Sequence, residues 1–369
     1  MSAALAIEHG VDAPVDPESA ERARLDAFAR DVRALEDELR AGMGSDDVAH
    51  LERLCAWRDK GLRWGRALTA VGFDPITFGL GCALLSVSKL LSVGPLGHDI
   101  YHGAWDKVPG AERFASETWD WDAPIDKEIW LTMHNRRHHP HTGKAEVDAD
   151  GHFVFARINP HVRRDALTRW QLMVAVLSLG AFTHLAHMQY MGVFDAFADK
   201  VLGRPRVHAE VLTTRQALGR WWRSVRGYVK RHYLVGPLWW GPLAPKVWLG
   251  EWIAGRVRDL ALFYFGFATH AGEGSRWHPE EHRSGSRGAW LRDQVAVTYN
   301  TRLPYWMSTV LDAVDFHIEH HVFHRLPSHL YRVAAPRLEA ICAEHGVPYR
   351  VEPLGRRIWA TFREFWRLR

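Results

Sequence analysis

Three histidine clusters, in a fixed order along the chain, constrain this sequence more than any other feature. Within each cluster imidazoles recur at a spacing of three or four residues, and the second and third clusters also contain an adjacent pair. The clusters are GHDIYH with His98 and His102, HNRRHHPH with His134, His138 and His139, and DFHIEHH with His317, His320 and His321. Such a spacing places side chains on one face of a helix. Because histidine is the commonest metal ligand, the pattern predicts helices that present imidazoles to metal.

The number of histidines indicates how many metal ions the clusters hold. One tetrahedral zinc takes about four ligands at most, whereas the clusters contain eight histidines. Neighbouring residues on a helix diverge, so an adjacent pair of imidazoles suits two neighbouring metals better than one. We therefore predict two metal ions. Imidazole binds zinc, copper, iron and nickel about equally well, so the ligand type does not choose the metal.

Other metal proteins fit this pattern less well. A membrane electron carrier with bis-histidine haem would use isolated histidines at facing helix positions, not adjacent pairs. The third cluster has the order HIEHH, which differs from the HExxH of zinc proteases. The three cysteines are widely spaced and form no CxxC, which indicates a reducing compartment and argues against a thiolate iron–sulfur or zinc site.

Further polar residues are candidates for supporting roles. Carboxylates can orient ligand imidazoles by accepting a hydrogen bond from them. The candidates are Asp99, Asp148, Asp150 and Glu319, which could instead be solvated or paired with arginine. His184 and His187 lie three residues apart on one helical face, within an apolar stretch. We expect them to form an interior hydrogen-bonded pair rather than a second reactive site.

Four apolar stretches predict helices that enter a membrane. Residues 76–96 match the ~20 apolar residues that cross a bilayer core, and residues 170–197 form a second stretch. Residues 233–271 are interrupted by charge near Arg256 and are interpreted as two segments, and residues 304–316 are moderately apolar. We therefore predict an all-α, integral-membrane protein. A soluble helical protein with long core helices is the alternative.

Amphipathic helices flank the apolar region. Residues 1–50 form a polar arm, in which an apolar stripe predicts a helix that ends at Gly42. The N-terminus lacks a basic region followed by an apolar run, so we expect no signal peptide. Residues 351–369 form a basic amphipathic helix, suited equally to a membrane surface and to packing on the body of the protein. Residues 51–350 form the central membrane domain between them.

The order HxxxH, HxxxHH, HxxHH resembles that of the membrane fatty acyl desaturase family. The flanking segments GHDIYHGAWD, MHNRRHHPHT and FHIEHHVFHRLPSHLYRVAAP are similar to a bacterial branch related to acyl-CoA and acyl-lipid desaturases. The similarity covers about residues 72–350. It implies that the central domain is the catalytic domain. It implies an all-α bundle of about four transmembrane helices in the bacterial inner membrane, with a cytosolic helical cap that carries the histidines. It also implies two iron ions, molecular oxygen and the removal of hydrogens from a long acyl chain.

The resemblance assigns metal ligands residue by residue. Those at matched positions are His98, His102, His134, His138, His139, His320 and His321. His270 in FGFATHAGE occupies the place of a further ligand, and His317 binds metal either directly or through another group. Three residues depart from the family: Gly266 lacks a polar group one turn before His270, Asp315 replaces Asn, and His324 replaces Pro. These departures bear on the outcome of the reaction rather than on metal binding.

The chain needs an external electron donor. It contains no HPGG haem segment, no cysteine iron–sulfur spacing and no GxGxxG, so a separate ferredoxin or flavoprotein reductase is implied. The net charge of +4 fits an acidic protein partner or anionic membrane lipid, and without a basic nucleic-acid motif we expect no nucleic-acid partner. The arginines that predict a basic surface for an acidic carrier, or for lipid phosphates, are Arg136, Arg137, Arg325 and Arg332.

The sequence leaves the substrate and the reaction outcome partly open. The acyl chain could be carried by coenzyme A, a lipid or an acyl carrier protein. A hydroxylase, acetylenase or ketolase on the same di-iron core is one alternative. A non-enzymatic, histidine-rich metal- or haem-binding membrane protein is another, and it predicts exposed ligands and no acyl tunnel. Zinc can replace iron in an expressed sample, because zinc outranks Fe²⁺ in affinity for nitrogen sites.

Overall fold

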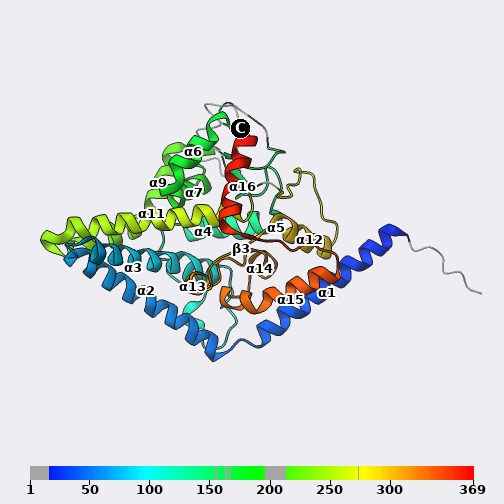
Figure 1. Cartoon of the computed structure of the whole chain (residues 1–369), viewed down its shortest axis with the longest axis horizontal. Coiled ribbons are helices and arrows are strands. Elements are labelled where there is room, and N and C mark those ends of the chain that lie inside the picture. The colour runs from blue at the N-terminus through cyan, green and yellow to red at the C-terminus, as the bar shows by residue number, and fades with distance from the viewer. Residues whose placement is uncertain are drawn as a thin grey trace, which may run out of the picture.

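The computed structural model describes residues 16–153, 156–162, 164, 166, 168–195, 213–272 and 274–369. Almost all of its regular structure is helical (Figure 1), which confirms the predicted all-α class. The α-helices are α1 (Pro17–Ala41), α2 (Ser45–Val71), α3 (Pro75–Val93), α4 (Lys127–Trp130), α5 (His139–His141), α6 (Gln171–Ser178), α7 (Phe182–Tyr190), α9 (Thr214–Val229), α10 (Gly236–Leu238), α11 (Ala244–Ala268), α12 (Arg287–Val297), α13 (Tyr305–Val310), α14 (His317–Val322), α15 (Tyr331–Glu344) and α16 (Leu354–Arg367).

Short helical turns and strands complete the described structure. The π-helical turns are η1 (Gly94–Asp99), η3 (Leu131–His138) and η6 (Lys230–Val235). The 3-10 turns are η2 (Glu112–Phe114), η4 (Thr168–Trp170), η5 (Leu179–Ala181), η7 (Gly241–Leu243) and η8 (Ser328–Leu330). Strand β1 (His152–Phe153) pairs antiparallel with β2 (Ala156–Arg157), and β3 (Asn300–Arg302) pairs parallel with β4 (Val351–Pro353). Two of the π-helical turns, η1 and η3, carry predicted metal ligands.

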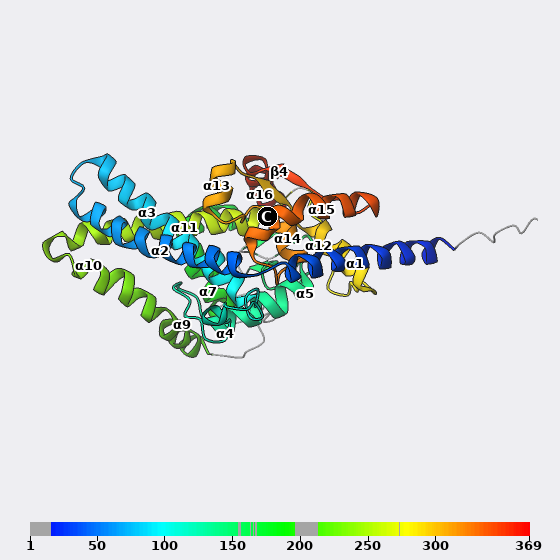
Figure 2. The same cartoon turned by 90° about the horizontal axis from the view of Figure 1, so that it is seen from below.

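The long helices form two groups that meet at the histidine clusters. Helices α2, α3 and α11 pack together and project to one side of the molecule, the left in Figure 1. Helices α1, α12, α14 and α15 pack together on the other side, and the view from below gives the same division (Figure 2). Helices α5 and α14, which carry predicted ligands, lie where the two groups meet.

The N-terminal helix forms as its sequence predicts. The Asp16 side chain caps α1 by accepting a hydrogen bond from Ser19 N, and the helix ends at Gly42. Its apolar stripe is buried, and Phe28 packs in one core with Ile318 of α14. Helix α1 therefore supports the helix that carries the third histidine cluster.

Two predicted membrane stretches coincide with helices that are long and apolar enough to cross a bilayer. Within the described residues these are Pro75–Asp99, with 25 residues, and Thr168–Tyr190, with 23 residues. The first is α3 continued by η1, and it begins at a proline that follows the capping carboxylate of Asp74. The second is interrupted by the 3-10 turn η5. The end of the predicted stretch 170–197 lies outside the described residues.

The two later apolar stretches differ from their predictions. The expected break near Arg256 is absent, because α11 runs through this position. The helix accommodates its charges because Arg256 and Arg258 form ion pairs with Asp259, at 3.2 and 2.7 Å. In residues 304–316 the only helix is α13, with six residues. The chain turns after α13 because Asp312 and Ala313 adopt positive φ angles, which end the helix.

The C-terminal helix packs on the body of the protein. Arg357 is 1% exposed, and its Nε donates a hydrogen bond to Ala268 O at 3.0 Å. Phe365 is fully buried against Phe263 and Phe267 of α11. Of the two arrangements that the sequence allowed, the structure shows packing on the body. The division into an arm, a central domain and a C-terminal helix stays a prediction.

Candidate metal centre

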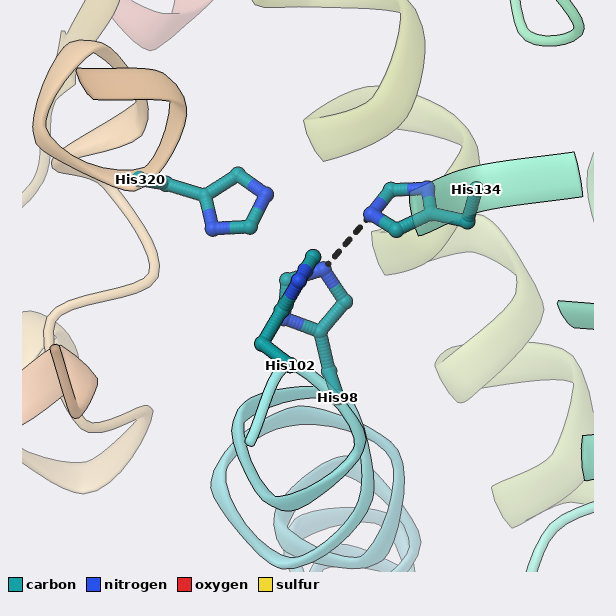
Figure 3. Close-up of side chains that lie close together, drawn as sticks. All are labelled: His98, His102, His134 and His320. Atoms are coloured by element: carbon teal, nitrogen blue, oxygen red, sulfur yellow. Dashed lines mark hydrogen bonds between the residues drawn. The ribbon is translucent and has the colours of Figure 1, made fainter. Parts of the chain in front are cut away.

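Imidazoles from all three predicted clusters meet in one group. His98 lies on η1, His134 on η3 and His320 on α14, and His102 follows η1. Figure 3 shows the four rings turned toward a common centre, and one nitrogen of each lies within 4.8 Å of those of the others. His98 Nε2 is 3.2 Å from His134 Nε2. Two nitrogens that share an ion at ~2.1 Å each must lie within ~4.2 Å of one another, and this pair meets that condition.

A second group of imidazoles forms around His270. His138, His270 and His321 each offer a nitrogen within 4.8 Å of the other two. His270 Nε2 is 2.8 Å from His317 Nε2 and 3.2 Å from His321 Nε2. The long helix α11 positions His270, which follows its C-terminal end by two residues. The ligand assigned through the family resemblance is thus brought to the third cluster.

The adjacent histidine pairs divide between the two groups. His138 belongs to the group around His270, whereas His139 Nε2 lies 3.1 Å from His134 Nε2. His320 joins the first group and His321 the second, and both also lie with His139 in a further set of three whose nitrogens are within 4.8 Å of one another. This divergence is the one expected for neighbouring residues on a helix. The structure therefore brings together all nine predicted ligands as two adjoining groups, and their binding of metal stays a prediction.

Carboxylates lie within hydrogen-bonding distance of the Nδ1 atoms of two imidazoles. His134 Nδ1 is 3.1 Å from Asp150 Oδ2, and His138 Nδ1 is 2.7 Å from Asp148 Oδ1. A carboxylate accepts the Nδ1–H proton, so in a neutral ring Nε2 is left with its lone pair directed away from that carboxylate. Asp148 and Asp150 thus take the predicted orienting role. Asp99 is less well placed, with 3.4 Å between its Oδ1 and the nearby imidazole.

Burial keeps most of these imidazoles neutral. Burial and then the neighbouring imidazoles hold the pKa far below its usual value for His102, His139, His270, His317, His320 and His321. Burial also lowers the pKa of His134 to about 3. Burial lowers the pKa of His138 as well, but the negative charges of Asp148 and Asp150 outweigh burial and raise that pKa to about 9. Metal binding would displace the proton of His138, because only the neutral ring is a ligand.

Several buried ring nitrogens have no hydrogen-bond partner among the described residues. They include both nitrogens of His102, Nδ1 of His139 and Nε2 of His320. A buried polar atom without a partner costs ~1–3 kcal/mol, so this group is unfavourable unless something else satisfies it. Lone pairs that converge from neutral imidazoles are the donor set of a transition-metal site. The residues therefore fit a pair of metal ions.

A cavity of about 230 Å³ reaches the imidazoles from the side of α7 and α11. Its walls are largely apolar and include Phe182 of α7 with Leu262 and Phe265 of α11. The clustered histidines that line it are His98, His134, His138, His270, His317 and His320, and His187 of α7 also lines it. Gly266 also lies on the wall, and a Cβ placed there would come no closer than 3.8 Å to Phe182. The cavity can hold an apolar chain directly against the candidate metal ligands.

Two predicted supporting residues have other partners. Glu319 accepts hydrogen bonds from Asn300 Nδ2 at 2.8 Å and from the Tyr349 hydroxyl at 2.6 Å, so it ties α14 to β3 and does not orient an imidazole. His187 is interior, as expected, but its Nε2 accepts a hydrogen bond from Asp126 N at 3.2 Å. Adjacent residues on a helix point in different directions, which explains why Glu319 does not contact the imidazoles of His320 and His321.

Other contacts of the site were not predicted from the sequence. The Tyr190 hydroxyl donates to Asp150, which in turn holds the second histidine cluster. Gln294 Oε1 is 3.1 Å from His321 Nδ1, and Thr142 Oγ1 is 3.3 Å from the same atom. These residues come from α7, α12 and the turn after α5, and no local spacing connects them to histidine.

Comparison with known proteins agrees with the geometry. The sequence matches the family described as fatty acid desaturase over residues 75–353. It is 24% identical over 350 residues to the NADPH-dependent stearoyl-CoA 9-desaturase of Mycobacterium tuberculosis (strain CDC 1551 / Oshkosh), covering 92% of this chain and 77% of that protein. It is also 24% identical over 300 residues to the sn-1 linoleoyl-lipid 6-desaturase of Synechocystis sp. (strain ATCC 27184 / PCC 6803 / Kazusa), covering 79% of each.

Proposed function

We propose that this chain, which belongs to the fatty acid desaturase family, introduces a double bond into a long-chain fatty acyl substrate at two histidine-bound iron ions. It is an oxidoreductase, and its similarity to acyl-CoA and acyl-lipid desaturases supports a substrate of either class. The observation that carries the proposal is the largely apolar cavity, which is lined by six of the clustered imidazoles. An exposed metal-handling site would offer no such cavity.

The two groups of imidazoles suggest how the irons are shared. The first iron would be held by His98, His102, His134 and His320, and the second by His138, His270, His317 and His321, with His139 between them. When bound, the iron pair would supply the oxidising power, drawn from molecular oxygen and external electrons, that breaks an unactivated C–H bond.

The chain itself would supply binding, orientation and the exclusion of water. The apolar cavity walls would hold an acyl chain extended past the imidazoles, so that one methylene among many similar ones lies at the reacting position. Phe182 and Phe265 would keep that position dry. Asp148 and Asp150 would keep protons on the Nδ1 atoms of their imidazole partners and so direct Nε2 inward.

We further propose a bundle of four membrane helices with the histidines on the cytosolic side of a bacterial inner membrane. Among the described residues, two helical segments are long and apolar enough to cross a bilayer. Large apolar side chains are 67–86% exposed at the turn between α2 and α3 and at the end of α10, before α11, which suits contact with lipid. They are Phe73, Ile76, Leu238 and Trp239. Three charged residues of α11 are buried instead: Glu251 and Asp259 are 0% exposed and Arg258 is 1% exposed.

A small acidic electron carrier, a ferredoxin or a flavoprotein reductase, is the donor that we propose. Its docking surface would be a basic patch made of Arg40, Arg287 and Arg325. Burial, and then the charges of these three arginines, lower the pKa of His324 to about 4. The His324 ring is 5.3 Å from that of His139, so the patch lies over the candidate metal centre. Of the arginines named from the sequence, Arg325 is in this patch.

Product analysis tests the function. The purified protein, loaded with iron and supplied with oxygen, a reduced ferredoxin and either stearoyl-CoA or a linoleoyl lipid, should form a product that has lost two hydrogens. Mass spectrometry of that product, with an unsupplemented control, distinguishes the outcomes. A product that has gained oxygen would instead favour the hydroxylase or ketolase. Absence of any product with either substrate, in a sample that holds two irons per chain, would contradict the proposal.

A further inference from the structure

A second set of metal-binding side chains lies outside the histidine centre. His50 of α2, Asp312 after α13 and His329 of η8 each offer one ligand atom within 4.8 Å of the other two. His50 Nε2 is 2.8 Å from Asp312 Oδ1, and the rings of His50 and His329 are 4.7 Å apart. Elements that are distant in sequence thus bring together two imidazoles and one carboxylate.

His329 and Asp312 each form a hydrogen bond on the side that faces away from the proposed site, as metal ligands commonly do. His329 Nε2 is 2.7 Å from Asp47 Oδ1, so this nitrogen donates its proton to a carboxylate. The other nitrogen, Nδ1, keeps its lone pair and is buried without a hydrogen-bond partner among the described residues. Asp312 Oδ2 accepts a hydrogen bond from Ser328 Oγ at 2.9 Å, which leaves Oδ1 facing His50. Metal-binding histidines commonly donate their second N–H to a carboxylate in this way.

The backbone at the carboxylate is strained. Asp312 has a φ of 53° and Ala313 has a φ of 61°, in the left-handed region that residues with a Cβ rarely adopt. Such strain persists when the surroundings hold the residue in place, and it gathers at functional sites. The contacts of Asp312 with His50 and Ser328 hold it there, and a shared metal ion would hold it more firmly.

We propose that His50, His329 and Asp312 bind one divalent transition-metal ion, for which Zn²⁺ is the probe. Two imidazoles and one carboxylate, with a further position open to water, form a donor set for Zn²⁺ or Fe²⁺. The ion positions the cavity wall, since Asp312 lines the acyl cavity and the loop after it leads into α14. Ser328 N also donates to Asp99 Oδ2 at 2.9 Å, next to His98, which links the two metal sites by hydrogen bonds.

Metal analysis of the purified full-length protein tests this site independently of desaturation. Wild-type protein should hold one more Zn²⁺ or Fe²⁺ per chain than His50→Ala and Asp312→Asn. The Asp312→Asn variant is the sharper of the two, because asparagine tolerates a positive φ and keeps a hydrogen-bonding side chain while it removes the anionic ligand. The matched control is His345→Ala, which removes a His–Asp contact of 2.7 Å with Asp31 and should keep the wild-type metal content.

Thermal unfolding gives a second measurement. Added Zn²⁺ should raise the unfolding temperature of wild-type and His345→Ala protein more than that of Asp312→Asn, because only the first two keep the site. Equal metal content and an equal response to Zn²⁺ in all three folded proteins would overturn the proposal. His50, His329 and their carboxylates would then form only hydrogen-bonded pairs.

Discussion

His134 and His139 are five residues apart, and their Nε2 atoms lie 3.1 Å from one another. Asp150 accepts from His134 Nδ1, so in the neutral ring Nε2 of His134 carries a lone pair and no proton. Burial holds the pKa of His139 far below its usual value, so a proton shared between the rings as a cation is disfavoured. As neutral rings the two can form one hydrogen bond, in which His139 donates its Nε2–H to His134 Nε2. A metal ion bound between the rings would instead take the lone pair of each nitrogen.

His139→Ala should therefore abolish turnover and lower the iron content, because His139 lies between the two groups of imidazoles. His324→Ala should be milder, since its ring is beside His139 but outside both groups. Iron per chain and product formation, measured on the same samples, check both variants. Full turnover with unchanged iron in His139→Ala would show that His139 is not a ligand.

Asp150→Asn should weaken metal binding or activity by ~10–100-fold, the usual effect of losing a carboxylate behind a ligand imidazole. The variant keeps the size of the side chain but removes the charge that holds His134 Nδ1–H. Tyr190→Phe removes only one hydrogen bond to the same carboxylate and should have a smaller effect. Iron titration of the apo-proteins gives the comparison, and equal affinities for wild type and Asp150→Asn would rule out this role.

Two glycines of α11 should respond oppositely to alanine. A Cβ at Gly250 would lie 2.5 Å from Thr69 Cγ2 of α2, whereas at Gly266 the nearest atom is 3.8 Å away. Gly250→Ala should thus lower the free energy of unfolding by ~1–3 kcal/mol through overpacking. Gly266→Ala should raise it by ~0.5–1 kcal/mol, because alanine costs less backbone entropy in a helix. Thermal unfolding in detergent measures both, and two unchanged midpoints would be inconsistent with this packing.

A larger residue at Gly266 should change which substrates are used. Leucine there would extend from the cavity wall, so turnover of a long acyl chain should fall more than that of a shorter one. Gly79→Leu is the control, since a Cβ at Gly79 meets no atom within 4 Å. Competition between two chain lengths, read by mass spectrometry, measures the preference. An unchanged preference in Gly266→Leu would mean that the acyl chain does not pass this residue.

Which histidines of one cluster share a face can be predicted from the sequence, because that information is local; that they bind metal stays a prediction. Spacing alone places His134 and His138 on one helical face and turns His139 away from them. The contact between His270 and His317 is different, as it joins the end of α11 to α14 across 47 residues. Helical periodicity carries no signal for such a pairing, and only the family resemblance identified His270.

The failures of prediction also have physical causes. Charge usually marks the end of an apolar helix, but in α11 Glu251 is paired with Arg66 and Lys89 on other helices, so the helix continues. The moderately apolar stretch 304–316 predicts a helix that enters a membrane, yet hydropathy does not register that Asp312 adopts a positive φ. Both features depend on tertiary partners that no window of sequence contains.

The proposed basic patch makes a prediction about electron transfer. Arg325 and Arg287 are exposed, so an acidic ferredoxin would be steered by charges that salt screens. Reduction should slow as the Debye length falls from ~10 Å at 0.1 M salt to ~3 Å at 1 M. Arg325→Glu should slow it at low salt and flatten the salt dependence, whereas Arg223→Glu, on the distant helix α9, should leave both unchanged. Stopped-flow reduction of iron-loaded protein measures these rates. If the rate is insensitive to ionic strength and to Arg325→Glu, the arginines serve lipid phosphates and the donor docks elsewhere.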